Sequence, residues 1–87
     1  MAYYLKCIYV QWIYPGEYLI SFNVLQQGAR NWCFVSKKDV IALNDREGLA
    51  KTVFCSSSGN KSLVRIIENY SFMNLEFEVP SSDIVKQ

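Results

Sequence analysis

The sequence contains no histidine among its 87 residues. Histidine has a side-chain pKa close to neutral pH, assists nucleophilic serine or cysteine, and is the commonest metal ligand in proteins. Its absence counts against the common hydrolytic and metal-dependent mechanisms. The sequence therefore predicts that the protein has no catalytic residues and is not an enzyme.

Cofactor and metal signatures are missing as well. The four glycines are isolated from one another, so no glycine-rich loop can hold a phosphate group. An odd number of cysteines lies at wide spacing, without the paired pattern of a zinc site, and each lies in an apolar run. We expect no cofactor, no metal, and reduced, buried cysteines in a cytoplasmic protein. These cysteines are Cys7, Cys33 and Cys55.

Long uninterrupted apolar runs are also lacking. Lys6, Glu17 and the turn at Pro15 and Gly16 interrupt the most apolar part of the chain. The beginning of the chain lacks the basic segment of a secretory leader. We therefore expect no membrane segment.

Apolar residues are abundant for so short a chain. At 87 residues, positions 1–87 form a single domain, and 51% of the residues are hydrophobic. A domain of this size buries a smaller share of its surface than a large domain does. Some apolar side chains should therefore meet a protein partner or a second copy, and we expect a homo-oligomer.

Apolar and polar residues alternate with the period of β-strands. Residues 3–13 predict a central strand, and 17–24 predict a half-buried strand with Tyr18, Ile20, Phe22 and Val24 inward. Further strands are expected at 32–35, 51–55, 62–68 and 75–79. The predicted fold is all-β and mainly antiparallel, a small five- to six-stranded barrel or sandwich.

One short helical segment is expected between the third and fourth of these strands. Ser36 and Asp39 stand at the spacing of a capping box, which favours a helix over 37–43 that turns Val40, Ile41 and Leu43 toward the sheet. The same β-branched run is compatible with a strand. A sheet with one packed helix, of the α+β class, is the rival fold. Residues 44–48 are expected as a polar connector and 56–61 as a hairpin loop.

The end of the chain, Val79-Pro80-Ser81-Ser82-Asp83-Ile84-Val85, resembles the close of SH3-type barrels. There an apolar-Pro-Ser segment forms a 3₁₀ turn that leads into the last strand. The resemblance covers these seven residues and implies a small barrel. This segment has one extra residue in the turn, and the acidic loop and paired tryptophans of that family are missing. The resemblance therefore assigns no peptide-binding residues.

The same segment echoes residues 35–41 at an offset of 44 residues. At this offset Leu5 aligns with Leu49 and Leu19 aligns with Leu63, which would suit a duplicated β-β-β unit. Only four paired positions are identical, however. The sequence favours a recurrent way of leaving a strand over a duplication.

The first hairpin holds more aromatic residues than one small core needs. Five of the six tyrosines and one tryptophan lie in the first 27 residues. Such residues are enriched where proteins bind one another. The sequence predicts a non-enzymatic protein that acts through protein-protein contacts, of a kind that includes inhibitor, immunity and phage-type accessory proteins. The predicted partner-binding residues are Tyr3, Tyr9, Trp12 and Tyr14.

Nucleic-acid binding by a small β-barrel is the alternative function. Segment 30–65 is basic, and aromatic residues within it could stack on bases. A net charge of +1 weakens this alternative, because phosphate-driven binding normally requires a clearly basic domain. Its candidate residues are Arg30, Trp32, Lys37, Lys38, Lys61 and Arg65.

Overall fold

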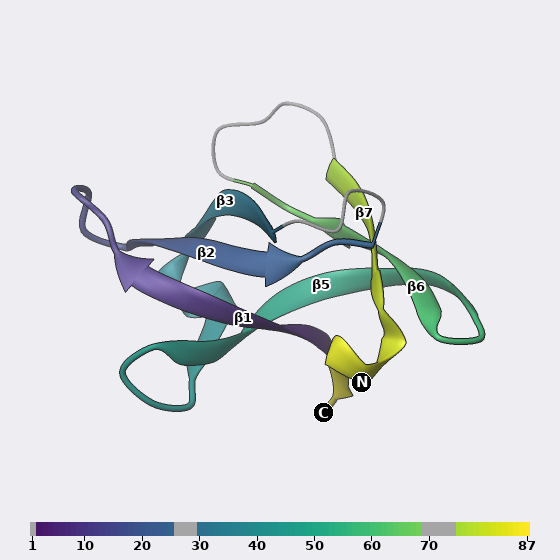
Figure 1. Ribbon diagram of the computed structural model, residues 1–87. Coiled ribbons are helices and arrows are strands. Elements are labelled where there is room, and N and C mark those ends of the chain that lie inside the picture. Colours follow the sequence, from purple (N-terminus) through teal and green to yellow (C-terminus); the bar gives the residue numbers. More distant parts are fainter. Residues whose placement is uncertain (1, 26–29, 69–74) are drawn as a thin grey trace.

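The computed structural model describes residues 2–25, 30–68 and 75–87 (Figure 1). Within these ranges the chain forms β-strands joined by turns and by two single 3₁₀ turns, η1 and η2. In chain order the elements are β1 (Tyr3–Gln11), β2 (Glu17–Asn23), β3 (Arg30–Ser36), η1 (Lys37–Asp39), β4 (Val40–Ala42), β5 (Glu47–Ser58), β6 (Lys61–Ile66), β7 (Leu75–Pro80), η2 (Ser81–Asp83) and β8 (Ile84–Lys86).

The strands pair into one antiparallel sheet. The order is β3-β2-β1-β5-β6-β7, while β4 pairs with β5 and β8 pairs with β1. The sheet curls into a half-barrel (Figure 1). This architecture confirms the predicted all-β fold of small-barrel type and the central position of β1. In the described ranges no α-helix packs on the sheet, so the α+β rival is wrong.

The core lies on the concave, inner face of the sheet. Strict alternation along β2 and β6 turns Ile20, Phe22, Val64 and Ile66 inward, and all four are fully buried. Tyr18 is half-buried against the same core, and Val24 is buried. The inward set predicted for the second strand is confirmed. The other buried apolar residues are Leu5, Cys7, Cys33, Val35, Leu49, Ala50 and Val79.

Three local predictions need correction. The helical segment after Ser36 is a single 3₁₀ turn, and residues 40–42 continue as β4, which leaves Leu43 59% exposed. Residues 47 and 48 belong to β5 instead of a polar connector, because Glu47 pairs with β1 and Gly48 pairs with both β1 and β4. β5 also continues through the serines to Ser58, so the expected hairpin loop shrinks to a tight turn at Gly59 and Asn60.

The two halves of the chain have the same architecture. Each contains three antiparallel strands in series, a 3₁₀ turn and a short final strand. The turns η1 and η2 are 44 residues apart, as are β4 and β8. The amide of Lys37 donates to the carbonyl of Gly16 at 2.9 Å, and the amide of Ser81 donates to the carbonyl of Asn60 at 2.9 Å, again 44 residues on.

Strand register follows the same repeat. Glu17 pairs with Ser36 in the first half, and Lys61 pairs with Pro80 in the second, so both partners shift by 44 residues. β1 and β5 correspond with a shift of 45, because Ile8 pairs with Ser21 and Val53 pairs with Arg65. The echo noticed in the sequence is therefore part of a repeat that spans all four strands of each half. An explanation limited to strand ends is too narrow.

The halves exchange their final strands. β4 of the first half pairs with β5, and β8 of the second half pairs with β1. The chain ends meet beside β1, where Ala2 and Gln87 exchange two backbone hydrogen bonds of 2.8 and 2.9 Å. The paired residues of β1 to β4 therefore have equivalents in β5 to β8, apart from the extra residue of β5 between Phe54 and Ser56.

Candidate functional site

The outer, convex face of β1, β2 and β3 carries a group of apolar and aromatic side chains. Side chains of residues paired across antiparallel strands lie on the same face. Register therefore aligns Ile8, Ser21 and Trp32 in one row and Val10, Leu19 and Phe34 in the next. The aromatic face is defined here as these residues together with the tryptophan that follows β1. Its apolar members are Ile8, Val10, Trp12, Leu19, Trp32 and Phe34.

Several of these side chains remain open to solvent. Trp32 is 56% exposed, Val10 43% and Trp12 38%. Trp12 packs on Phe34, with ring centroids 5.5 Å apart. Both tryptophans of the chain thus belong to one face of one sheet. Clustered exposed rings of this kind are typical of surfaces that bind another protein.

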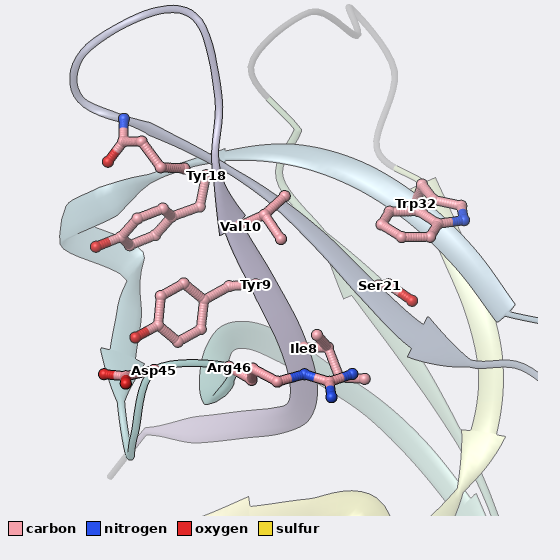
Figure 2. A pocket seen from close by; sticks show the side chains of 9 residues that line it. Ile8, Tyr9, Val10, Tyr18, Ser21, Trp32, Asp45 and Arg46 are labelled. Carbon is pink, nitrogen blue, oxygen red and sulfur yellow. The ribbon is translucent and has the colours of Figure 1, made fainter.

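A shallow groove of about 560 Å³ continues this face past the free part of β1. The pairing of β1 with β5 ends at Ile8. Next to it, the backbone amide of Tyr9 donates a hydrogen bond to the carbonyl of Arg46 at 2.8 Å. In Figure 2 the rings of Tyr9 and Tyr18 lie on one side of β1 and Trp32 on the other, while the Arg46 side chain extends toward Ile8.

The two tyrosines are held by their surroundings. Their ring centroids are 4.7 Å apart, and the Nζ atom of Lys37 lies 5.1 Å from the centroid of the Tyr18 ring. The Tyr9 hydroxyl donates to the carbonyl of Asn44. Desolvation raises the pKa of Tyr9 above its ordinary value, and the neighbouring Tyr18 and Asp45 add to that effect. At neutral pH the Tyr9 phenol therefore keeps its proton and forms a neutral wall of the groove.

The equivalent face of the second half is chemically different. There Val53, Arg65 and Glu76 form the row that corresponds to Ile8, Ser21 and Trp32. Glu78, paired with Leu63, stands where the first half has Phe34. Arg65 and Glu76 approach to 4.0 Å. Two carboxylates thus occupy the positions of two aromatic rings.

The second half shows which residue types a strand of this sheet can carry at the outer positions equivalent to Trp32 and Phe34. The same strands pair in the same register in both halves, and β7 forms with glutamates at these two outer positions. Aromatic rings on the outside of β3 are therefore not required by the sheet. Trp32 is exposed and Phe34 is half-buried, so these two rings are the candidate contact residues of β3.

The four predicted partner-binding residues lie in different environments and do not form one cluster. Tyr3 stacks on Phe54 with centroids 4.8 Å apart, and Tyr9 packs against the core and Tyr18. Trp12 belongs to the aromatic face through its contact with Phe34. Tyr14 is 58% exposed in the connection between β1 and β2. Of these four, Trp12 is the residue that the structure joins to the aromatic face.

The candidates for nucleic-acid binding lie on several elements. Lys37 and Lys38 lie in η1, Lys61 begins β6, and Arg65 lies in β6 near Glu76. Trp32 lies on the outer face of β3, where it is a member of the aromatic face. Arg30 is the first residue of β3.

Sequence reasoning missed four members of the aromatic face. Ile8, Val10, Leu19 and Phe34 lie on strands that the sequence had placed, yet only strand register aligns them. One signal was available in the sequence. Alternation within the strand at 32–35 turns Trp32 and Phe34 to the face opposite Cys33 and Val35, which are both buried.

Neither a metal site nor a helix able to cross a membrane occurs in the ranges 2–25, 30–68 and 75–87. Comparison with family models, curated proteins and solved structures found no match for the chain.

Proposed function

We propose that this protein is a small, non-enzymatic, cytoplasmic binding protein that acts through protein-protein contacts made by its aromatic face. The class includes inhibitor, immunity and phage-type accessory proteins, which work by covering a surface of another macromolecule. The absence of histidine from the sequence supports a role without catalysis.

One observation carries the proposal. The positions of Trp32 and Phe34 are occupied by Glu76 and Glu78 in the equivalent strand of the second half. Both strands belong to the same sheet and adopt the same register, so folding accepts carboxylates there. Aromatic rings contribute large contact areas at low entropic cost, and tryptophan is enriched among residues that dominate binding energy.

The test transfers the chemistry of the second half onto the first. Trp32→Glu places in β3 the residue found at the equivalent position of β7. Glu76→Gln is the matched control on the equivalent outer face of the second half. Both variants should keep the circular dichroism spectrum and unfolding midpoint close to those of the wild type, because both sites are exposed.

Affinity capture from the native host's lysate then compares the three proteins. We expect specific bound proteins for the wild type and for Glu76→Gln, and their loss for Trp32→Glu. Equal capture by all three folded proteins would show that the aromatic face is not the contact surface. Bound proteins that a nuclease treatment releases equally from all three would favour the nucleic-acid alternative.

A further inference from the structure

The geometry points to a second copy of this chain as the occupant of the aromatic face, packed face to face about a twofold axis. This inference rests on the proposed function, since it names the partner of the same surface. In such an isologous contact each patch meets its own copy, so residue i of one chain meets residue j of the other and the reverse. The patch must therefore complement itself in shape, size and charge.

Its size suits a dimer of so small a protein. The partly exposed apolar side chains of the aromatic face offer roughly 400 Å² of surface, given the areas typical of tryptophan, phenylalanine and aliphatic residues. A standard interface covers about 800 Å² on each partner, of which a little over half is apolar. The face thus supplies the apolar centre of one such interface, with the polar margin left to supply the rest.

The polar margin is balanced in charge. On the side of β5, register places Glu47 beside Ile8 and places Lys6 on the same outer face, one row away. Asp45 and Arg46 line the groove next to them. Two acids and two bases along one margin give no preference to an acidic or a basic partner. They do suit a copy of the same surface, in which Asp45 of each chain can face Arg46 of the other.

The strand edge beside this face is protected from pairing with another sheet. The backbone amide of Trp32 donates a hydrogen bond to the Oδ1 atom of Asn31 at 3.0 Å. The Phe34 amide donates to the Oε1 atom of Glu68 at 3.4 Å. Side chains that occupy the edge amides of β3 oppose edge-to-edge association. A second copy is therefore expected on the face of the sheet and not along the edge of β3.

The experiment combines sedimentation with intrinsic fluorescence of the full chain. Both tryptophans lie on the aromatic face, so burial of that face by a second copy should shift the emission to shorter wavelength. Over a dilution from about 500 µM to about 1 µM, we expect a dimer-to-monomer transition in sedimentation and a matching red shift in emission. Trp32→Phe retains Trp12 as a single reporter.

Three variants identify the surface. Trp32→Glu should raise the dimer dissociation constant at least about tenfold, while Glu76→Gln should leave it unchanged. Asp45→Lys and Arg46→Glu should each weaken self-association, because each sets like charges against one another across the axis. An equimolar mixture of these two variants should associate better than either one alone, since opposite charges then meet.

The outcomes separate this inference from the proposed function. A wild-type chain that stays monomeric at every concentration overturns the inference, as does a dimer whose dissociation constant Trp32→Glu does not change. If the monomeric wild type still captures proteins from lysate and Trp32→Glu does not, the proposed function stands without the dimer. If folded Trp32→Glu keeps both self-association and capture, the dimer inference and the proposed function are both rejected.

Discussion

The three cysteines differ in environment although the sequence places all of them in apolar runs. Cys7 and Cys33 are buried as expected, with Cys33 only 1% exposed. Cys55 is exposed, which corrects the expectation of a buried side chain. It lies at the register shift between Phe54 and Ser56, where β5 contains an extra residue. A bulge of this kind changes the direction of a side chain without any change in local hydrophobicity.

Thiol reactivity should reveal this difference. In native protein at neutral pH, Cys55 should react with a thiol-specific reagent at least about 100-fold faster than Cys7 or Cys33, because only Cys55 is accessible. Stopped-flow or timed absorbance would show one fast equivalent, and unfolded protein would show three. Cys55→Ser should remove the fast phase. Two fast equivalents in the native wild type would contradict the burial of either Cys7 or Cys33.

The Cys33 thiol also links stability to high pH. Desolvation raises its pKa from an ordinary value of 9.0 to about 12, with a smaller contribution from the charge of Glu68. Between these values the native thiol keeps its proton while the unfolded thiol loses it. The contribution of Cys33 to the free energy of unfolding is therefore complete below about pH 9 and declines as pH rises toward about 12.

Denaturant unfolding of the wild type and Cys33→Ala at several pH values would measure this effect. The difference in unfolding free energy between the two proteins should be constant up to about pH 9 and should shrink above it. A difference that remains constant to about pH 11 would show that the thiol is not the group responsible.

At the scale of elements, the beginning of β5 is the place where space is tightest. A Cβ atom added at Gly48 would lie 3.0 Å from the carbonyl oxygen of Ile41, 3.1 Å from Cδ1 of Tyr9 and 3.2 Å from Cγ1 of Val40. β1 and β4 flank this glycine on its two sides. The close approach of β4 to Tyr9 therefore depends on the missing side chain.

Gly48→Ala should lower the free energy of unfolding by about 1–3 kcal/mol, because the backbone of β4 must move to admit the methyl group. Gly59→Ala is the comparison. It has open space, and its φ of 63° costs about 1 kcal/mol in a residue with a Cβ atom. Chemical denaturation of both variants would measure the two losses. A smaller loss at Gly48 than at Gly59 would contradict the crowding seen here.

Strands were predicted correctly where apolar and polar residues alternate strictly. The prediction failed where polar residues form a strand. The segment 75–79 alternates, and β7 occupies Leu75–Pro80 with Val79 fully buried. Glu47 and Ser56 to Ser58 read as turns because their side chains favour turns, yet they belong to β5. Pairing with β1 and β6 supplies backbone hydrogen bonds that no local preference encodes.

At the scale of the whole molecule, the repeat makes the junction of Ala2 and Gln87 equivalent to an internal turn. The ends meet at Ala2 and Gln87 beside β8 and β1, and the turn at 43–46 joins β4 to β5 in the equivalent place of the first half. In that turn Asn44 accepts backbone hydrogen bonds from Arg46 and Glu47 on Oδ1, at 2.9 and 2.7 Å. The chain is continuous between β4 and β5 and open between β8 and β1, but each pair of strands is hydrogen-bonded in the same way.

A circular permutant should therefore fold. Joining the two ends of this 87-residue chain by a short glycine-serine linker and opening it between Asn44 and Asp45 exchanges the order of the halves. We expect the same circular dichroism spectrum and a loss of about 1–3 kcal/mol in unfolding free energy, because the hydrogen bonds of the turn become those of chain ends. Opening the chain inside β6, between Val64 and Arg65, is the control and should abolish folding. Failure of both permutants would contradict the structural equivalence of the halves.

The sequence by itself determined the class of the fold, the identity of the inward residues on β2, and the lack of histidine chemistry. Those features depend on local periodicity and on residue types. The tertiary structure alone decided that Ile8, Val10, Leu19, Trp32 and Phe34 share one face, and that Glu76 and Glu78 stand in the equivalent places. Register across strands far apart in the sequence creates both relations. Side-chain alternation sets which face a residue occupies, but only pairing sets which neighbours it meets there.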